Sequence, residues 1–384
     1  MTHTHNDVTL TKAEVFVFRA PIDTPVRTSF GIMRERPAVF VRLEDKDGAC
    51  GFGEAWCNFP ACGAEHRGRL LETVLFPLVL NIPFQSPSQL IALLEKKTRV
   101  LRLQCDESGP LAQCMTSLDI AMWDLFARRE GKALHAYLNS TSKKSVPVYA
   151  SGINQKDALD TLLQCREEGF SSFKFKIGFD EERDLRTVQT LFQTLLDHES
   201  LAADVNQAWD FPTALRMAKR LADFPLLWIE EPLGCDAPPS QWLHLKEESS
   251  LSLAAGENFR SEKTCQTFLE NPYLGVIQPD ICKWGGISHT IAFVRQCLAK
   301  NIRYCPHFLG GAIGLAASAH VLSALGGDGL LEVDVNPNPL RSRLNSSSPV
   351  HDGSFHLSEK AGLGIEPPFE EIESMRTFYA KCVA

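Results

Sequence analysis

Ionisable side chains recur in the second part of the chain wherever a short apolar run gives way to a polar loop. They are Lys176, Asp204, Glu230, Glu257, Asp280, His307 and Glu332. If such carboxylates converge in a buried site they need a counter-charge, because an unpaired buried charge is strongly destabilising. Asp204, Glu230 and Glu257 would offer only oxygen ligands, which suit a hard cation such as Mg2+ with positions left open for a substrate.

The stretch FKFKIG at 173–178 places a second lysine, Lys174, two residues before Lys176. Side chains on a strand alternate between its two faces, so both lysines share one face and the apolar residues between them share the other. An isolated strand of this kind would simply hold its lysines in water. The repeated carboxylates favour instead a strand whose lysines face a common site.

His307 and Asp280 lie one predicted strand apart, each at the end of its strand. A lone histidine is more often a structural residue than a catalytic one. Here Asp280 is expected at the same level, where its carboxylate can accept a hydrogen bond from the imidazole. A histidine held in this way is a tuned base, so the pair is predicted to move protons.

The elements that would position these residues form a repeated unit of apolar strand, polar loop and amphipathic helix. The expected strands are VPVYAS, SFKFKI, LAADVN, LLWIEE, LSLAAG, LGVIQP, IRYCPH and LLEVDV. Parallel neighbours need long crossovers and a closed sheet removes the edges, so a parallel α/β barrel is predicted for residues 146–345. In such barrels the chemistry sits at the carboxyl ends of the strands, and both lysines would point toward the barrel mouth.

The first part of the chain, residues 1–145, has a different pattern. Short β-like runs at 9–20, 37–45 and 49–55 are separated by turn residues and predict an antiparallel sheet. Two amphipathic helices are expected afterwards, the second ending before Gly131. Together they predict an α+β region, to which the last segment, 346–384, is expected to return.

The overall composition limits the partners. A net charge of −8 over 384 residues gives no basic surface for a phosphate backbone, so no nucleic acid is expected. The N-terminal stretch MTHTHNDVTLTKAEV lacks the basic start and apolar core of a signal peptide, and no apolar run is long enough for a membrane span. These features favour a cytoplasmic protein that acts on a small molecule.

Taken together, these residues resemble the enolase superfamily and, within it, the mandelate racemase subgroup. The resemblance covers nearly the whole chain. It implies a modified TIM barrel, (β/α)7β, with an α+β capping domain formed by the N-terminal region and the C-terminal segment. It also implies Mg2+-dependent removal of the α-proton of a carboxylate substrate by a homo-oligomeric enzyme.

Individual roles follow from the same resemblance. Lys176 would be the base on one face of the substrate, and Lys174 would contact the substrate carboxylate. Asp280 and His307 would form a dyad on the opposite face, and Glu332 would donate a hydrogen bond to the substrate carboxylate. The metal would be held by Asp204, Glu230 and Glu257.

Substrate-binding residues are also suggested by the resemblance. Asn206 lies in NQAW, where some sugar-acid dehydratases of the subgroup place a histidine, and this wording is closer to members that act on fuconate, talarate or galactarate. Two specificity loops should correspond to 27–33 and 56–66. They contain the expected substrate contacts Thr28, Ser29, Phe30 and Asn58.

The leading functional hypothesis is dehydration of a sugar acid, an aldonate or aldarate, to a 2-keto-3-deoxy acid. Racemisation or epimerisation of a 2-hydroxy acid would use the same residues and stays open as an alternative. A Schiff base on Lys176, as in an aldolase, is a remote alternative because it would leave the three expected metal ligands without a use.

Overall fold

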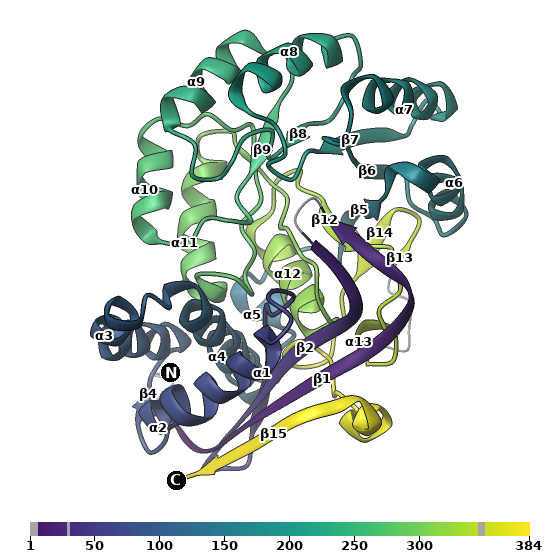
Figure 1. Ribbon diagram of the computed structural model, residues 1–384. Coiled ribbons are helices and arrows are strands. Elements are labelled where there is room, and N and C mark those ends of the chain that lie inside the picture. Colours follow the sequence, from purple (N-terminus) through teal and green to yellow (C-terminus); the bar gives the residue numbers. More distant parts are fainter. Residues whose placement is uncertain (1–6, 29–30, 345–349) are drawn as a thin grey trace.

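The computed structural model describes residues 7–28, 31–344 and 350–384, which form a capping region and a barrel (Figure 1). The capping region is built on an antiparallel sheet in the order β15-β1-β2-β3. Its strands are β1 (Val8–Thr28), β2 (Gly31–Asp45), β3 (Cys50–Ala55) and β15 (Arg376–Val383), and β4 (Pro83–Phe84) pairs with the start of β1. The three strand runs predicted in the N-terminal region are therefore confirmed, and β1 is longer than expected.

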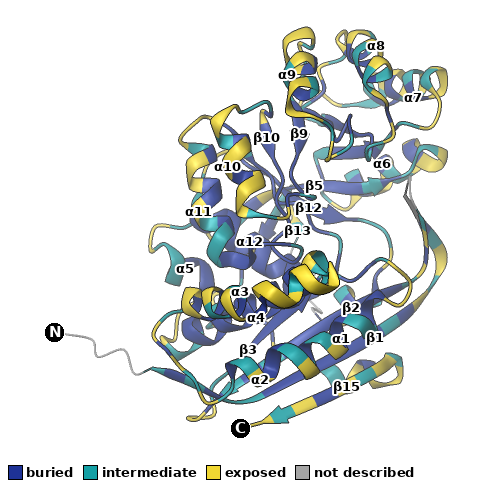
Figure 2. Ribbon diagram, turned by 60° about the vertical axis from the view of Figure 1, so that its left-hand side comes forward, coloured by how far each residue is buried: buried dark blue, intermediate teal, exposed yellow. Residues whose placement is uncertain are grey.

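Helices cover one side of this sheet. They are α1 (Gly63–Leu70), a π-helical turn (Leu71–Leu75), α2 (Phe76–Val79), α3 (Pro87–Cys105), α4 (Ser108–Arg129) and α5 (Leu134–Leu138). Helix α4 is buried along most of its length and packs on β3 (Figure 2). Gly51 and Gly53 permit this close packing, because a Cβ at either would lie within 2.1 Å of a carbonyl oxygen of α4.

The barrel consists of parallel strands in the order β11-β10-β9-β8-β7-β6-β5, with β12 pairing with β5. Their bounds are β5 (Ser145–Ile153), β6 (Ser172–Lys176), β7 (Ser200–Asp204), β8 (Ile229–Glu230), β9 (Leu253–Ala255), β10 (Val276–Ile277), β11 (Arg303–Tyr304) and β12 (Leu331–Asp334). All of them lie within the strands expected from the sequence or overlap them. The last strand thus lies beside the first, as a (β/α)7β barrel requires.

One helix follows each barrel strand up to β11. These helices are α6 (Ala158–Glu167), α7 (Glu181–Thr194), α8 (Phe211–Leu221), α9 (Pro239–Glu248), α10 (Glu262–Glu270), α11 (Gly286–Leu298) and α12 (Ala312–Leu325). Several begin at a polar residue whose side chain accepts a backbone N–H, as Asp180 does at α7 and Asp210 at α8, both at 2.9 Å. Such capping fixes where each loop ends, and therefore where the strand-end residues before it lie.

The C-terminal segment contributes to both sheets. After α13 (Pro339–Ser342), the hairpin of β13 (Val350–His351) and β14 (Ser354–His356) pairs with β5 of the barrel. A 3-10 helix (Phe369–Met375) and β15 then return to the capping sheet, where β15 lies along β1 (Figure 1). Among the described residues, no helix combines the length and apolarity needed to cross a bilayer.

Candidate active site

A small cavity lies where the capping region meets the carboxyl ends of the barrel strands. Its lining includes most of the residues singled out in the sequence, namely Lys174, Lys176, Asp204, Asn206, Glu257, His307, Glu332 and Asn58. Glu230 and Asp280 lie directly behind this lining, each bonded to a residue that forms it. Residues from different barrel strands therefore converge as the parallel register predicts.

Lys174 and Lys176 project inward from β6, while Phe173 and Phe175 on the same strand are fully buried on its other face. Lys174 Nζ lies 2.6 Å from Glu230 Oε1 and 2.8 Å from Glu332 Oε1. Burial alone would lower the pKa of Lys174, but these two carboxylates raise it well above its ordinary value. Lys174 is therefore a fixed ammonium group.

Lys176 lies nearer the cavity opening. Its Nζ is 3.3 Å from Asp204 Oδ2 and also donates to Asn206 Oδ1. Asp204 ends β7, and its Oδ1 accepts the backbone N–H of Asn206 at 2.9 Å. Asn206 has a positive φ of 47°, a conformation that asparagine tolerates better than most residues. The turn at Asn206 and Gln207 thus places the Asn206 amide oxygen in contact with the Lys176 ammonium.

Glu230 and Glu231 lie at the end of β8 with opposite orientations. Glu230 Oε2 accepts from Trp228 Nε1 at 3.1 Å and from Gln278 Nε2 at 2.5 Å, inside the barrel. Glu231 accepts from Gln207 and Asn258 on the loop side. Burial raises the pKa of both carboxyl groups, and the neighbouring Glu257 raises that of Glu231 further.

The donor chemistry of these strand ends fits a divalent cation. Asp204, Glu230 and Glu257 are buried carboxylates on the neighbouring strand ends of β7, β8 and β9. Burial raises the pKa of Glu230, and the nearby Asp204 and Glu332 raise it further, whereas His307 and Lys283 lower the pKa of Glu257 against the effect of burial. In the part of the chain that the structure describes, no three Asp, Glu, His or Cys side chains could hold one ion as arranged, because lysines and His307 contact these oxygens instead.

His307 follows β11 and is held between two carboxylates. Its Nδ1 lies 2.8 Å from Asp280 Oδ2, and its Nε2 lies 2.6 Å from Glu257 Oε2. Burial would lower the pKa of His307, but Glu257 and Glu332 raise it well above its ordinary value. Asp280 itself is fixed, since its Oδ1 accepts the N–H of Cys282 at 2.8 Å. The expected Asp–His contact is therefore present.

Glu332 acts only as an acceptor in this arrangement. It accepts from Ser151 Oγ, from the Phe308 N–H at 3.0 Å, and from Lys174. Burial would raise the pKa of Glu332, but Lys174 and His307 lower it overall. The donor role that the resemblance implied for Glu332 therefore requires that it first takes up a proton.

The cavity also includes Trp56, the first residue of the expected loop 56–66, and polar residues that were not predicted, namely Ser151, Lys283, Asp334 and Asn336. Lys283 Nζ lies 3.4 Å from Glu257 Oε2 and 4.8 Å from the centre of the Trp56 ring. Asp334 lies two residues after Glu332 on β12, so the period of two that identified the lysine pair also points to it. Lys283 lies in a turn, where no such period exists.

The two expected specificity loops are described in part. Asn58 lines the cavity, and its Nδ2 donates to the carbonyl oxygen of Leu309 at 2.8 Å. Thr28 ends β1 opposite Gly31, and Val26 of the same strand lines the cavity. Ser29 and Phe30 lie outside the described residues.

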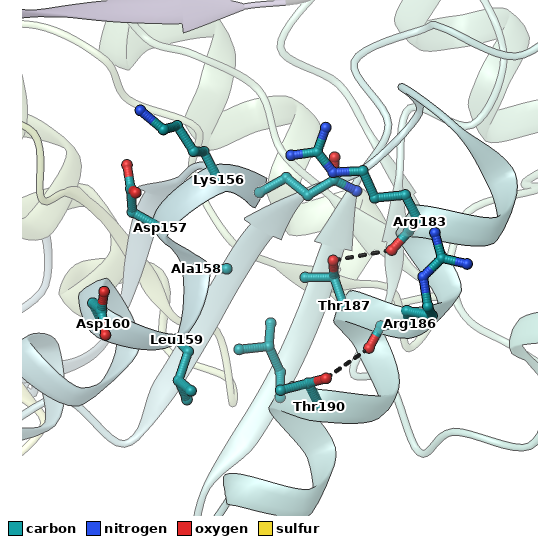
Figure 3. Close-up of a pocket in the computed structure, with 11 residues that line it drawn as sticks. Lys156, Asp157, Ala158, Leu159, Asp160, Arg183, Arg186, Thr187 and Thr190 are labelled. Carbon is teal, nitrogen blue, oxygen red and sulfur yellow. Dashed lines mark hydrogen bonds between the residues drawn. The ribbon is translucent and has the colours of Figure 1, made fainter.

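A second hollow lies between the start of α6, with the short 3-10 turn before it, and residues 183–191 of α7 (Figure 3). Exposed residues such as Lys156, Asp157, Arg183 and Arg186 line it. The side chains of Thr187 and Thr190 donate to backbone carbonyls of their own helix. The ionisable side chains that line this hollow are exposed, whereas those that line the cavity at the strand ends are mostly buried.

A barrel that brings lysines, carboxylates and an Asp–His pair together at its strand ends has groups that can transfer protons and hold a cation. Residues 12–138 match the family model "Mandelate racemase / muconate lactonizing enzyme, N-terminal domain", and residues 157–372 match "Enolase C-terminal domain-like". The chain therefore belongs to the mandelate racemase/muconate lactonizing enzyme family of the enolase superfamily.

Relatives in this family catalyse several reactions. The chain is 25% identical over 376 residues to a D-galactarolactone cycloisomerase of Agrobacterium fabrum, covering 93% of this chain and 96% of that protein. It is 31% identical to an L-talarate/galactarate dehydratase of Salmonella typhimurium, covering 67% and 64% of the two chains. An N-succinyl-L-Arg/Lys racemase of Bacillus cereus is 21% identical over 96% of this chain and 98% of its own.

Solved structures agree with the fold. A mandelate racemase/muconate lactonizing enzyme from Bordetella bronchiseptica RB50 superposes with a TM-score of 0.91 at 44% identity, covering 96% of this chain and 99% of the other. The Salmonella typhimurium LT2 L-talarate/galactarate dehydratase liganded with Mg and L-lyxarohydroxamate superposes with a TM-score of 0.86 at 22% identity, covering 100% and 96%. Members of the family thus bind Mg2+.

Proposed function

We propose that the protein is a Mg2+-dependent dehydratase that converts a sugar acid to a 2-keto-3-deoxy acid. The observation that carries this proposal is the joint presence of Lys176 and His307 in one cavity, most of whose other lining residues have polar or charged side chains. Lys176 comes from β6 and His307 follows β11, so the two proton-transfer groups approach a substrate from different sides. Dehydratases among the relatives support the same reaction class.

The reaction starts at C2 of the substrate. Lys176 in its amine form takes the proton from C2, and the electron pair moves into the carboxylate to give an enediolate. The Lys174 ammonium stabilises the added negative charge. His307, positioned by Asp280, gives a proton to the C3 hydroxyl, which leaves as water when the C2–C3 double bond forms. The resulting enol then tautomerises to the 2-keto acid.

Asp204, Glu230 and Glu257 are the residues that would hold Mg2+, which when bound supplies positive charge beside the substrate carboxylate. Glu332 binds the same end of the substrate once it carries a proton. The hydrogen bonds of Asn206 with Lys176 and of Asn58 with the Leu309 carbonyl hold both amide groups in the cavity, where substrate hydroxyls are expected. Racemisation or epimerisation would use the same residues, but His307 would then return a proton to carbon in place of giving one to the leaving hydroxyl.

The test is a panel of aldonic and aldaric acids, incubated with the enzyme and Mg2+, with 2-keto acid measured as its semicarbazone. At least one acid should give product, and excess EDTA should abolish the reaction. A silent panel together with racemisation of an amino acid derivative or a mandelate-like acid would contradict the dehydratase proposal. Full activity of the metal-free protein would contradict the role given to the three carboxylates.

A further inference from the structure

Two neutral side chains inside the barrel hold the carboxylate of Glu230, and the proposed reaction gives neither of them a role. Trp228 Nε1 donates to Glu230 Oε2 at 3.1 Å, and Gln278 Nε2 donates to the same oxygen at 2.5 Å. Each of the three residues is at most 2% exposed. Trp228 and Gln278 are not among the described residues that line the cavity, so any role in the reaction must act through Glu230.

Trp228 belongs to an apolar cluster that fills the inside of the barrel. The members of this cluster are Tyr149, Ala202, Trp228, Ala254, Val276, Cys305 and Leu330. Ala202 and Ala254 come from β7 and β9, the two neighbours of β8, and their small side chains leave room for the indole. The Trp228 and Tyr149 rings meet edge to face with their centres 5.3 Å apart. The indole is thus fixed by packing, and its N–H points in one direction.

Gln278 follows β10, which lies two strands away from β8. Its Nε2 must face Glu230, because an ionised carboxylate can only accept hydrogen bonds. Its Oε1 is buried and receives no hydrogen bond from the residues that the structure describes. A buried amide oxygen without a protein partner costs stability, so packing alone would favour an apolar side chain here. The hydrogen bond to Glu230 explains the amide.

The two donors leave the other oxygen of Glu230 for the active site. Glu230 Oε1 lies 2.6 Å from the Nζ of Lys174, which lines the cavity. The same ammonium lies 4.0 Å from Asp204 Oδ2, and Asp204 pairs with Glu230 in the parallel register of β7 and β8. Glu230 Oε1 therefore lies on the side of the cavity, and Oε2 lies on the side of Trp228 and Gln278.

We propose that Trp228 and Gln278 are positioning residues that turn Glu230 so that it offers a divalent cation one oxygen, Oε1. The inference rests on the proposed function, in which Glu230 is one of three Mg2+ ligands. The terminal torsion of a glutamate is broad, so an unsupported carboxylate turns easily and loses this freedom when it binds an ion. Two hydrogen bonds from fixed donors remove the freedom before the ion binds.

The test measures Mg2+ binding to the metal-free protein by titration calorimetry, with Mn2+ binding by electron paramagnetic resonance as an independent readout. Trp228→Phe keeps an aromatic ring in the cluster and removes the N–H, and Gln278→Leu replaces the amide with an apolar group of similar size. Each should raise the Kd for both ions about 10- to 100-fold. The two substitutions act on the same oxygen from different strands, so the inference does not depend on both variants folding.

Controls separate positioning from general damage to the fold. Trp242→Phe makes the same change at a tryptophan of α9 that is 2% exposed, and its Kd should stay within about twofold of the wild type. Glu230→Gln should abolish binding, and tight binding by this variant would overturn the inference. Wild-type protein that binds neither ion would contradict the proposed function as well. Wild-type binding with an unaltered Kd in folded Trp228→Phe and Gln278→Leu would overturn only the positioning role.

Discussion

Lys176 and His307 differ in how firmly the protein holds them, and this difference bears on their roles. His307 has a carboxylate on each ring nitrogen, whereas Lys176 contacts Asp204 and the amide oxygen of Asn206 near the cavity opening. At the residue scale, the period of two within FKFKIG correctly predicted that Lys174 and Lys176 face the same side of β6, toward the cavity. The same period in LEVDV places Asp334 on the same face as Glu332. Asp334 was missed because only one ionisable residue was predicted for this strand. Lys283 could not be predicted, because a turn has no fixed side-chain period.

Lys176→Ala and His307→Asn should fail in different ways. Each should lower the rate of product formation by about 10²–10⁴-fold, as expected for loss of a positioned proton-transfer group. If the α-proton lies on the Lys176 side, His307→Asn should still exchange it with deuterium from the solvent, because only departure of the hydroxyl is blocked. NMR of the recovered substrate in D2O measures this exchange. Lys156→Ala, an exposed lysine beside α6, is the control, and equal exchange by the two active-site variants would contradict the assignment.

At the scale of elements, the C-terminal segment is a structural part of the capping sheet. Phe369 lies among Phe16, Phe18, Phe40 and Phe52, with ring centres 4.5 to 6.3 Å away. Helices and barrel strands could be predicted because their apolar patterns are local. The pairing of β15 with β1 joins residues near opposite ends of the chain, and no local pattern specifies which strand is the partner. The pairing of the β13–β14 hairpin with β5 was missed for the same reason, although the Asp352–Gly353 turn of the hairpin is itself a local signal.

Phe369→Ala should therefore lower the free energy of unfolding by about 2–3 kcal/mol, below the range for a fully buried ring because Phe369 is half-buried. Urea unfolding followed by circular dichroism gives the change. Phe179→Ala removes a ring that is 53% exposed and should stay within about 0.5 kcal/mol of the wild type. Equal effects of the two substitutions would show that the aromatic cluster does not anchor the segment.

At the scale of the whole molecule, the cavity exists only because the capping region and the barrel are bonded together around it. Arg36 of β2 reaches Asp334 of β12, and Asn58 reaches the carbonyl of Leu309. Glu54 of β3 accepts the backbone N–H groups of Gly311 and Gly314 at the start of α12. These contacts join residues hundreds of positions apart, so the sequence predicted both regions but not how they fit together.

Glu54 makes this junction sensitive to pH. Burial raises the pKa of Glu54 from 4.5 to about 7, although the two glycine N–H groups lower it. The folded protein therefore keeps a proton that the unfolded chain releases near its ordinary pKa. The stability that this proton contributes is complete below about pH 4.5 and is lost as the pH rises through about 7. A shift of this size corresponds to roughly 3 kcal/mol.

Glu54→Gln stays neutral at every pH and should lack this loss. Relative to the wild type, its free energy of unfolding should improve by a few kcal/mol between about pH 5 and about pH 8, measured by urea unfolding. Comparing differences between the two proteins cancels the other titrating groups, which both share. Glu270→Gln, at an exposed position at the end of α10, is the control and should follow the wild type across the range. A Glu54→Gln difference that does not change with pH would mean that Glu54 is ionised in the folded protein, with its charge balanced by the N-terminus of α12.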